Sequence, residues 1–212
     1  MTRDHILHRI RTALGRSAGQ APSADLPPVR LVVPEVDREA RIALFTARLD
    51  ALGGKTQRAA TADEACALVA AAIQGKSAVA SNAPLLAECG NTALAGVETG
   101  IADRQQLQDR CAAVQVGITG AEYALADTGS LVMLSSAQEA RLISLLPPAH
   151  IAVVPVEHLL TGLDELFTLL PRPAEQTSSM VLITGPSRTA DIEQILVRGV
   201  HGPGRITVFI AR

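Results

Sequence analysis

The sequence predicts an α/β fold of three layers, in which helices cover both faces of a mixed, mostly parallel sheet. Two observations carry this prediction: short, continuous apolar runs, and helical patterns that alternate with those runs along the chain. The composition agrees, because 48% of the 212 residues are hydrophobic and 19% are charged, as in an ordered globular protein.

The first 35 residues are expected to form a segment separate from the folded domain. Residues 3–15 have apolar side chains at helical spacing between basic ones, at Ile6, Leu7, Ile10 and Leu14. This pattern indicates a basic amphipathic helix, which could dock on its own domain, on a membrane or, as we favour, on a protein. The following residues contain Pro22, Pro27, Pro28 and Pro34, typical of an extended linker. We therefore expect the α/β domain to span residues 36–212.

Helical and strand patterns alternate from Val36 onward. Asp37–Leu52 is expected to be helical up to Gly53, and the sequence Thr61-Ala62-Asp63-Glu64 is a capping box that opens a helix through Ile73. Further helices are expected at Glu157–Leu170 and from about Ala190. The apolar runs predict six strands, at Ser77–Ser81, Val114–Thr119, Leu131–Leu134, Ile151–Val154, Met180–Thr184 and Arg205–Ile210. The close spacing of the second and third strands indicates at least one antiparallel pair.

Composition and missing motifs exclude several classes of function. The net charge of -2, the single Tyr and the absence of Trp argue against a nucleic-acid-binding protein. The cysteines, Cys66, Cys89 and Cys111, form no CxxC motif, so the sequence predicts no iron–sulfur or zinc site. An odd number of unpaired cysteines fits a reducing cytosol. We find no signal peptide and no apolar run of membrane-spanning length, so we expect a cytoplasmic protein that is not integral to a membrane.

The stretch from Gly117 to Leu131 is the first candidate ligand site. Glycines that allow close approach of the backbone alternate there with polar side chains between two apolar strands. The candidates in this stretch are Gly120, Glu122, Asp127, Thr128 and Gly129. The alternative interpretation is a glycine-rich hairpin connection without a ligand.

The stretch from Thr184 to Glu193 is the second candidate site. Gly185 permits a tight turn, Ser187 or Thr189 is expected to cap the next helix, and Arg188 could clamp a carboxylate or phosphate. Asp191 and Glu193 would repel an anion unless they pair with Arg188, face a ligand hydroxyl or sit at the helix dipole. An ordinary capped loop with a surface arginine fits equally well. His201 and Gly202 precede the last strand and could reach the same edge of the sheet.

Two stretches, GITGAEYALADTGSLVML and LITGPSRTADIEQILVRGVHGPGRITVFI, resemble the paired signatures of the LUD-domain family. The resemblance covers roughly residues 36–212, and the N-terminal helix and linker are similar to the leader of members of the lactate utilization protein C type. It implies a fold similar to the NagB/RpiA/CoA-transferase-like group, which agrees with the mixed sheet expected above.

The resemblance also implies a part in the oxidation of L-lactate to pyruvate, beside an iron–sulfur subunit and a cysteine-rich partner subunit. Larger family members carry ferredoxin-type cysteine clusters, whereas this sequence has none. We therefore expect a cluster-free subunit that binds a small anionic ligand, has no cofactor of its own and relies on iron–sulfur clusters of a partner. The family motifs imply these ligand-binding residues, to which the glycine pattern adds Gly120: Glu122, Asp127, Thr128, Gly129, Gly185, Ser187, Arg188, Thr189, Asp191, Glu193, His201 and Gly202.

Two other interpretations stay open at the level of the sequence. The chain could be an independent enzyme, either a CoA-transferase-like enzyme or one acting on a sugar phosphate, with Glu122 as its nucleophile. It could also be a scaffold whose loops are purely structural. In none of these interpretations is the isolated chain expected to be a redox enzyme.

Overall fold

The computed structural model describes residues 2–19, 36–191 and 195–212. The chain divides into two compact units, Met1–Arg30 and Leu31–Arg212. Most of the predicted linker and the candidate Glu193 lie outside the described residues.

The first unit contains α1 (Arg3–Ala13), in agreement with the helix predicted over residues 3–15. The Thr2 hydroxyl caps it by accepting a hydrogen bond from the His5 N–H. No residue of this helix is buried, and its stripe is exposed at Ile6 (45%), Ile10 (50%) and Leu14 (62%). The apolar face of α1 therefore has no covering partner among the described residues of its own unit.

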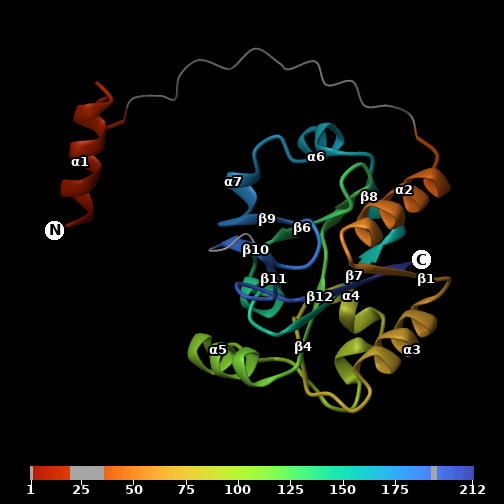
Figure 1. Cartoon of the computed structure of the whole chain (residues 1–212). Helices are drawn as coiled ribbons and strands as arrows, with labels where there is room; N and C mark the ends of the chain where they lie inside the picture. Colours follow the sequence, from red (N-terminus) through yellow and green to blue (C-terminus); the bar gives the residue numbers. More distant parts are fainter. Residues whose placement is uncertain (1, 20–35, 192–194) are drawn as a thin grey trace. The chain divides into compact units, whose positions relative to one another are not determined.

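The second unit is built on a six-stranded sheet in which every pair of neighbours is parallel (Figure 1). In spatial order its strands are β1 (Lys55–Ala59), β12 (Arg205–Ala211), β7 (Ala149–Pro155), β4 (Val116–Gly120), β2 (Ala78–Ala80) and β3 (Val97–Glu98). The central strands are apolar on both faces, which is expected of a parallel sheet covered on both sides. The prediction of a three-layer α/β fold is therefore confirmed.

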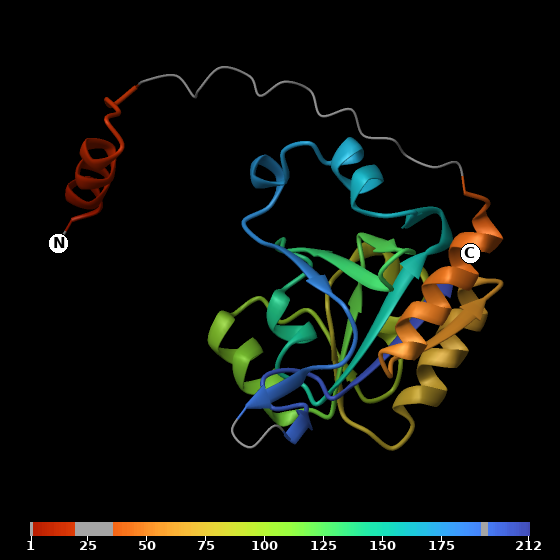
Figure 2. The ribbon, with the colours of Figure 1, turned by 45° about the horizontal axis from the view of Figure 1, so that its top comes forward.

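Helices α3 (Ala62–Ile73) and α4 (Pro84–Glu88) cover one face of this sheet (Figure 2). Because side chains alternate along a strand, Ile151 and Val153 of β7 face α3. Val69 and Phe209 complete the centre of this layer and are almost fully buried. Helix α5 (Arg104–Ala113) packs Leu107 and Cys111 beside Val79, in a smaller cluster.

The other face is covered by α2 (Arg38–Ala51) together with a second sheet. Ala152 and Val154 of β7 face this layer, where they meet the fully buried Phe45 and Leu49 of α2. The second sheet has the order β8 (Leu159–Leu160), β5 (Tyr123–Leu125), β6 (Ser130–Leu134) and β9 (Met180–Ile183). Its pairs β5–β6 and β6–β9 are antiparallel. The predicted antiparallel pairing therefore belongs to this sheet, and Leu131–Leu134 does not pair with Val114–Thr119.

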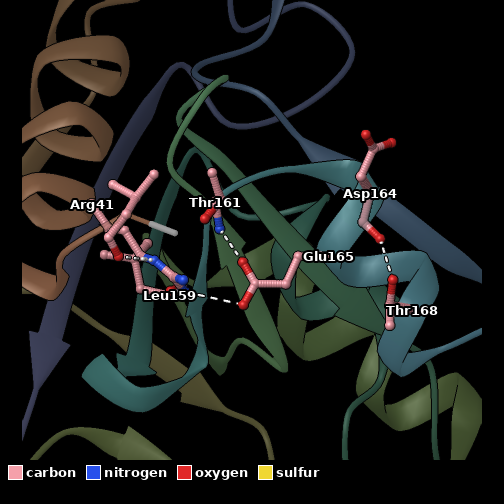
Figure 3. Close-up of polar contacts among 7 residues, drawn as sticks. Arg41, Leu159, Thr161, Asp164, Glu165 and Thr168 are labelled. Carbon is pink, nitrogen blue, oxygen red and sulfur yellow. Dashed lines mark hydrogen bonds and ion pairs between the residues drawn. The ribbon is translucent and has the colours of Figure 1, made fainter. Parts of the chain in front are cut away.

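A half-buried ion pair fixes α2 to the end of the second sheet (Figure 3). The Arg41 guanidinium lies 3.1 Å from Glu165 Oε1 and donates to the Leu159 carbonyl. The Thr161 N–H donates to the other Glu165 oxygen at 2.7 Å. Burial raises the pKa of Glu165, but the Thr161 hydrogen bonds and the Arg41 charge outweigh it, and the pKa lies below its usual range.

Two predicted helices are wrong. The segment Glu157–Leu170 contains the 3₁₀ turn Val156–His158, strand β8 and only then α6 (Leu163–Leu169), followed by the short α7 (Pro173–Gln176). The helix expected from about Ala190 is replaced by a hairpin of β10 (Arg188–Asp191) and β11 (Ile195–Arg198). Ser187 and Thr189 consequently cap no helix, and no helix dipole is available to an anion in the described part of this loop.

Candidate functional site

The carboxyl ends of β2 and β4 flank the point at which the strand order reverses. The chain leaves β2 toward β3, at one edge of the sheet, whereas it leaves β4 toward β7, in the opposite direction. Loops that diverge in this way leave a crevice outside the carboxyl ends of the strands, which is where open α/β sheets bind their ligands. Ser81 follows β2 directly and Gly120 ends β4, so these two residues border the reversal.

A cleft of about 320 Å³ opens at this point. Its walls come from the ends of β2, β4 and β7, from the loop after β6 and from the segment after α7. Among the residues that the structure describes, no lysine or arginine lines it. The polar residues around it are Glu122, Ser135, Ser136, Gln138, Glu139, His158, Gln176 and Thr177.

The Glu139 carboxyl group lies between the carboxyl ends of β2 and β4 and forms a hydrogen bond with each. Its Oε2 accepts from the Ser81 hydroxyl at 2.8 Å and from the Gly120 N–H at 3.1 Å. Its Oε1 is buried and has no hydrogen-bond partner in the described part of the chain. Burial, with a smaller contribution from the nearby charge of Glu122, raises the pKa of Glu139 to about 8 against the effect of these two donors. An acid with such a pKa exchanges a proton readily near neutral pH.

The loop that carries Glu139 is held in place by the Ser136 side chain and by the segment after β2. The Ser136 hydroxyl accepts from the N–H groups of Gln138 at 3.2 Å and Glu139 at 2.9 Å. The Asn82 N–H donates to the Gln138 carbonyl at 2.9 Å, which ties the loop to the segment after β2. The carboxyl group is therefore positioned by two loops that are far apart in sequence.

Gly120 has a steric role in the same cleft. A Cβ atom at this position would lie 3.2 Å from the Ala83 Cβ and 3.5 Å from Glu139 Oε2. A side chain would therefore crowd the space between α4 and the carboxyl group. Glycine at this position therefore keeps the space beside the Glu139 carboxyl group free of a side chain.

Glu122 and His158 form the opposite wall. The Glu122 side chain is exposed, and its backbone carbonyl lies 2.8 Å from His158 Nδ1. Because a carbonyl oxygen only accepts, Nδ1 must carry a hydrogen, which leaves Nε2 of the neutral ring as an acceptor. The Tyr123 ring, at a centroid distance of 5.4 Å, also orients the imidazole. The cleft thus presents an acid, a carboxylate and an imidazole acceptor.

The structure separates the sequence-predicted candidates into three groups. Gly120 and Glu122 lie in the cleft. Thr128 and Gly129 belong to a turn against α2, where the Ser130 hydroxyl donates to Thr128 Oγ1 at 2.8 Å and lies 2.7 Å from Thr184 Oγ1. Asp127 in the same turn is exposed and lies beside Gly162.

The loop after β9 also lies at the end of α2. A Cβ at Gly185 would approach the Leu52 Cβ to 3.0 Å, and the Arg188 guanidinium donates to the Leu52 carbonyl. Thr189 lies half-buried on β10, and Asp191 ends this strand. Arg188 therefore binds the terminal carbonyl of α2 in this structure.

Ser187, His201 and Gly202 make up the third group. The Ser187 N–H donates to the Pro203 carbonyl at 2.9 Å, and Gly202 lies against the Ser187 side chain. The Gly204 N–H donates to Pro148, immediately before β7, so this loop lies at the amino ends of the parallel strands. The exposed His201 therefore belongs to the edge opposite the cleft.

Ser81, Glu139 and His158 are site residues that the sequence reasoning missed. Ser81 carried a usable signal, because it ends a predicted buried strand, where ligand-binding residues gather. Glu139 carried none, since it lies in a polar loop and meets Ser81 only in the folded chain. His158 was masked by the prediction of a continuous helix around it.

The cysteines lie away from the cleft, on α3, at the end of α4 and on α5. Burial raises the pKa of Cys111 to about 11 and also raises that of Cys89, so both thiols stay protonated at neutral pH. Among residues 2–19, 36–191 and 195–212, no group of three or more His, Cys, Asp or Glu side chains is arranged to hold a metal ion. Within the same ranges, every helix is too short or too polar to cross a membrane.

Several curated proteins align with this chain over about half of their own length. Lactate utilization protein C of Halalkalibacterium halodurans is 39% identical over 105 residues, which are 48% of this chain and 46% of that protein. Lactate utilization protein C of Bacillus subtilis is 40% identical over 92 residues, 42% of this chain and 38% of that protein. The uncharacterized protein YkgG of Escherichia coli is 34% identical over 134 residues, 53% of this chain and 57% of that protein.

The fold has a counterpart in the crystal structure of a DUF162 family protein from Deinococcus radiodurans. The TM-score is 0.64 at 19% sequence identity, and the match covers 84% of this chain and 99% of that one. The model of the LUD domain matches residues 42–211, which include both sheets and the whole cleft. This protein therefore belongs to the LUD domain family.

Proposed function

We propose that this protein acts in lactate utilization and that the cleft at Glu139 is its ligand site. The relatives named lactate utilization protein C support the first part. The observation that carries the second is the buried Glu139 carboxyl group, which has a raised pKa and bridges the ends of β2 and β4.

The chemistry of the cleft favours a small 2-hydroxy acid such as lactate. The described lining residues include no arginine or lysine, so neutral donors must hold a ligand carboxylate. The Ser136 hydroxyl accepts two backbone N–H groups and keeps its own hydrogen to donate. Protonated Glu139 adds an O–H group, while Glu122 or His158 Nε2 accepts from the ligand hydroxyl. A 2-hydroxy acid meets both requirements, because its carboxylate accepts from Ser136 and Glu139 and its hydroxyl donates to Glu122 or His158.

We further propose that the chain is the cluster-free, cytoplasmic subunit of an L-lactate-oxidising complex with a fold of the NagB/RpiA/CoA-transferase-like group. Oxidation of lactate to pyruvate releases two protons and two electrons. The proton acceptors of the cleft take the protons. The two electrons pass to the iron–sulfur clusters of one partner subunit, beside which a cysteine-rich partner subunit acts.

Direct titration tests the ligand site. Calorimetry with L-lactate and with pyruvate is expected to show binding to the wild type that is weakened at least tenfold by Glu139→Ala, which removes the side-chain donor. Glu157→Ala removes a side chain from an exposed position outside the cleft and serves as the matched control. Equal affinities in the wild type and in Glu139→Ala would remove the cleft from the proposal.

Co-purification tests the complex. The tagged protein, isolated from cells grown on lactate, is expected to bring with it a partner that contains iron and acid-labile sulfide. Recovery of the protein alone under gentle conditions, with full lactate-dependent growth after its deletion, would contradict the proposed role.

A covalent transferase is the second candidate, because the exposed carboxylate of Glu122 lies in the same cleft. In that mechanism the Glu122 carboxylate attacks an acyl-CoA carbonyl, which forms a mixed anhydride and expels the CoA thiolate. The thiolate then attacks the glutamyl carbonyl, so that a glutamyl-CoA thioester forms and the acyl group leaves as a free carboxylate. Intact-mass measurement after incubation with acyl-CoA substrates would reveal the added CoA mass in the wild type and its loss in Glu122→Gln. No added mass under any acyl-CoA excludes this candidate.

A further inference from the structure

A second hollow lies at the amino ends of the parallel strands, on the edge opposite the cleft. It has a volume of about 230 Å³ and is bordered by the first residues of β1, β12 and β7 and by the end of α3. Its position separates it from the lactate site proposed above. The inference that follows does not rest on that proposal.

Strand register places two cationic side chains on the same face of the sheet in this hollow. Lys55 of β1 is the partner of Thr207 of β12, and Arg205 stands two residues before Thr207. Because side chains alternate along strands, Arg205 and Thr207 share the face of Phe209, and Lys55 shares the face of Ala59. Phe209 and Ala59 both pack in the cluster under α3, so Lys55, Arg205 and Thr207 all face α3.

Lys76 supplies a third cation from the segment after α3. Its side chain is half-buried, and its Nζ donates to the Ala72 carbonyl in the last turn of that helix. One hydrogen bond uses one of its three donors, so two remain for a ligand. Gly53 also lines the hollow, and a Cβ at Gly53 would lie 3.1 Å from the Arg198 guanidinium, so that a further cation lies next to this lining residue.

The cations of this hollow are not neutralised by acidic neighbours among the described residues. None of its lining residues is Asp or Glu, and in the described part of the chain neither Lys55 nor Arg205 has an ion-pair partner. The protein as a whole has 21 acidic and 19 basic residues, so composition does not account for the clustering. Like charges that share one face of neighbouring strands destabilise a sheet.

Another hollow on the protein, lined by arginines, has the usual arrangement in which acidic side chains accompany the basic ones. It has about 310 Å³, and its arginines Arg38, Arg58 and Arg212 are accompanied by Glu39 and Glu64. Arg58 forms a two-point ion pair with Glu39, at 2.6 and 2.9 Å. The hollow at Lys55 differs because its cations have no acidic residue beside them. Their charge is therefore available to an anionic ligand.

We propose that the hollow formed by Lys55, Lys76 and Arg205 binds the phosphate group of a small molecule. Three cations reach it from three separate elements, which suits an anion with several oxygens and two negative charges better than a planar carboxylate with one. The Thr207 hydroxyl adds a neutral donor or acceptor. The volume corresponds to a small ligand and not to an extended polymer.

Calorimetric titration of the full chain with inorganic phosphate and pyrophosphate tests the site. Both are expected to bind, pyrophosphate more tightly, and the double variant Lys55→Ala/Arg205→Ala is expected to bind at least tenfold more weakly. Arg38→Ala, which removes a cation from the hollow that contains acids, is the matched control and is expected to bind like the wild type. Circular dichroism verifies that each variant is folded.

Equal phosphate affinity in the wild type and the double variant would overturn the proposal. An equal loss of affinity in Arg38→Ala would overturn it too, and so would a phosphate signal that sodium chloride of the same ionic strength reproduces. Binding of an acidic peptide without binding of phosphate would also contradict it and would make the hollow a docking site for a protein segment. If the double variant is unfolded, the single variant Lys76→Met is compared with the wild type by phosphorus NMR. The wild type is expected to broaden the phosphate line more than Lys76→Met does, and equal broadening would overturn the proposal.

Discussion

The Ser81 hydroxyl donates to Glu139 Oε2 at 2.8 Å, at the point where the strand order of the six-stranded sheet reverses. The bond holds the loop after β6 over the crevice between β2 and β4. It also lies next to a carboxyl oxygen that has no partner among the described residues. Most buried polar atoms have a hydrogen-bond partner, so the unpartnered oxygen requires an explanation, and a role in ligand binding or catalysis supplies one.

Glu139 should make the protein less stable as the pH rises. Its pKa is about 8 in the folded state against 4.5 for the ordinary group. Below pH 4.5 it is protonated in both states and has no effect on stability, whereas above pH 8 the folded state must hold a buried anion. At 1.4 kcal/mol per unit the penalty reaches roughly 5 kcal/mol. Glu139→Gln should remove this slope in urea unfolding between pH 5 and 8, and parallel slopes for both proteins would show that Glu139 is ionised throughout.

His150 should act in the opposite pH range. It is fully buried, its Nε2 lies 2.8 Å from Thr119 Oγ1, and burial lowers its pKa from 6.5 to about 4. Above pH 6.5 it is neutral in both states, and as the pH falls toward 4 only the unfolded state gains a proton. Stability is therefore lost by roughly 3 kcal/mol over this range. Urea unfolding of His150→Gln should show a flatter profile than the wild type, and parallel profiles would show that His150 does not cause this loss of stability.

Gly129→Ala should destabilise the protein by more than its backbone conformation alone requires. Gly129 has a φ of 68°, and a Cβ there would lie 2.7 Å from the Leu49 backbone nitrogen. Gly75 has a φ of 70°, and a Cβ there would meet no atom within 4 Å among the described residues. Gly75→Ala therefore measures the conformational cost by itself, about 1 kcal/mol. Chemical denaturation of both variants separates the conformational cost from the cost of the clash with α2. Equal losses in the free energy of unfolding would mean that α2 shifts to accommodate the Cβ at no cost in stability.

Arg188→Ala should lower stability slightly because the guanidinium donates to the Leu52 carbonyl at the end of α2. A charged donor at a helix C-terminus contributes about 1 kcal/mol, which corresponds to a melting temperature lower by roughly 2–4 °C. Differential scanning calorimetry measures this change. An unchanged melting temperature together with lost lactate binding would instead support Arg188 as a ligand clamp.

Limited proteolysis should release the N-terminal segment and leave a fragment that begins near Val36. The expectation rests on the four prolines between residues 22 and 34 and on the separate unit formed by α1. N-terminal sequencing of the resistant fragment identifies the boundary. Cleavage of the core at the same rate as the segment would place the boundary elsewhere.

The elements with strong local signals were predictable from the sequence. At the capping box, the Thr61 hydroxyl accepts from the Glu64 N–H at 3.1 Å, as predicted. The returning bond differs in detail, because Glu64 Oε2 accepts from Ala60 and not from Thr61. The buried strands were equally visible, since a central parallel strand must be apolar on both faces.

The errors arose where tertiary pairing overrides local pattern. Leu159 and Leu160 fit a helical stripe, but they pair with Ala124 and Leu125 of β5. The residues around Ala190 fit a helix as well, yet β10 and β11 pair across a hairpin.

The cleft was only half predictable for the same reason. Gly120 and Glu122 could be recognised because they follow a buried strand. Glu139 could not, because its two donors come from β2 and β4, and only the order of the strands brings them to one place.

The pairing of β1 with β12 has a consequence for how the molecule is made. Lys55–Ala59 is an early segment of the unit, but its partner in the sheet is Arg205–Ala211. While the polypeptide emerges from the ribosome, β1 has an unpaired edge until β12 is synthesised. The edge of β7 that pairs with β12 is unpaired for the same time. Closure of so distant a contact is slow and leaves strand edges open to wrong partners. Nascent-chain folding is therefore expected to complete in one late step, and frameshifts that spare every catalytic candidate but remove β12 should yield aggregates instead of a partly active protein.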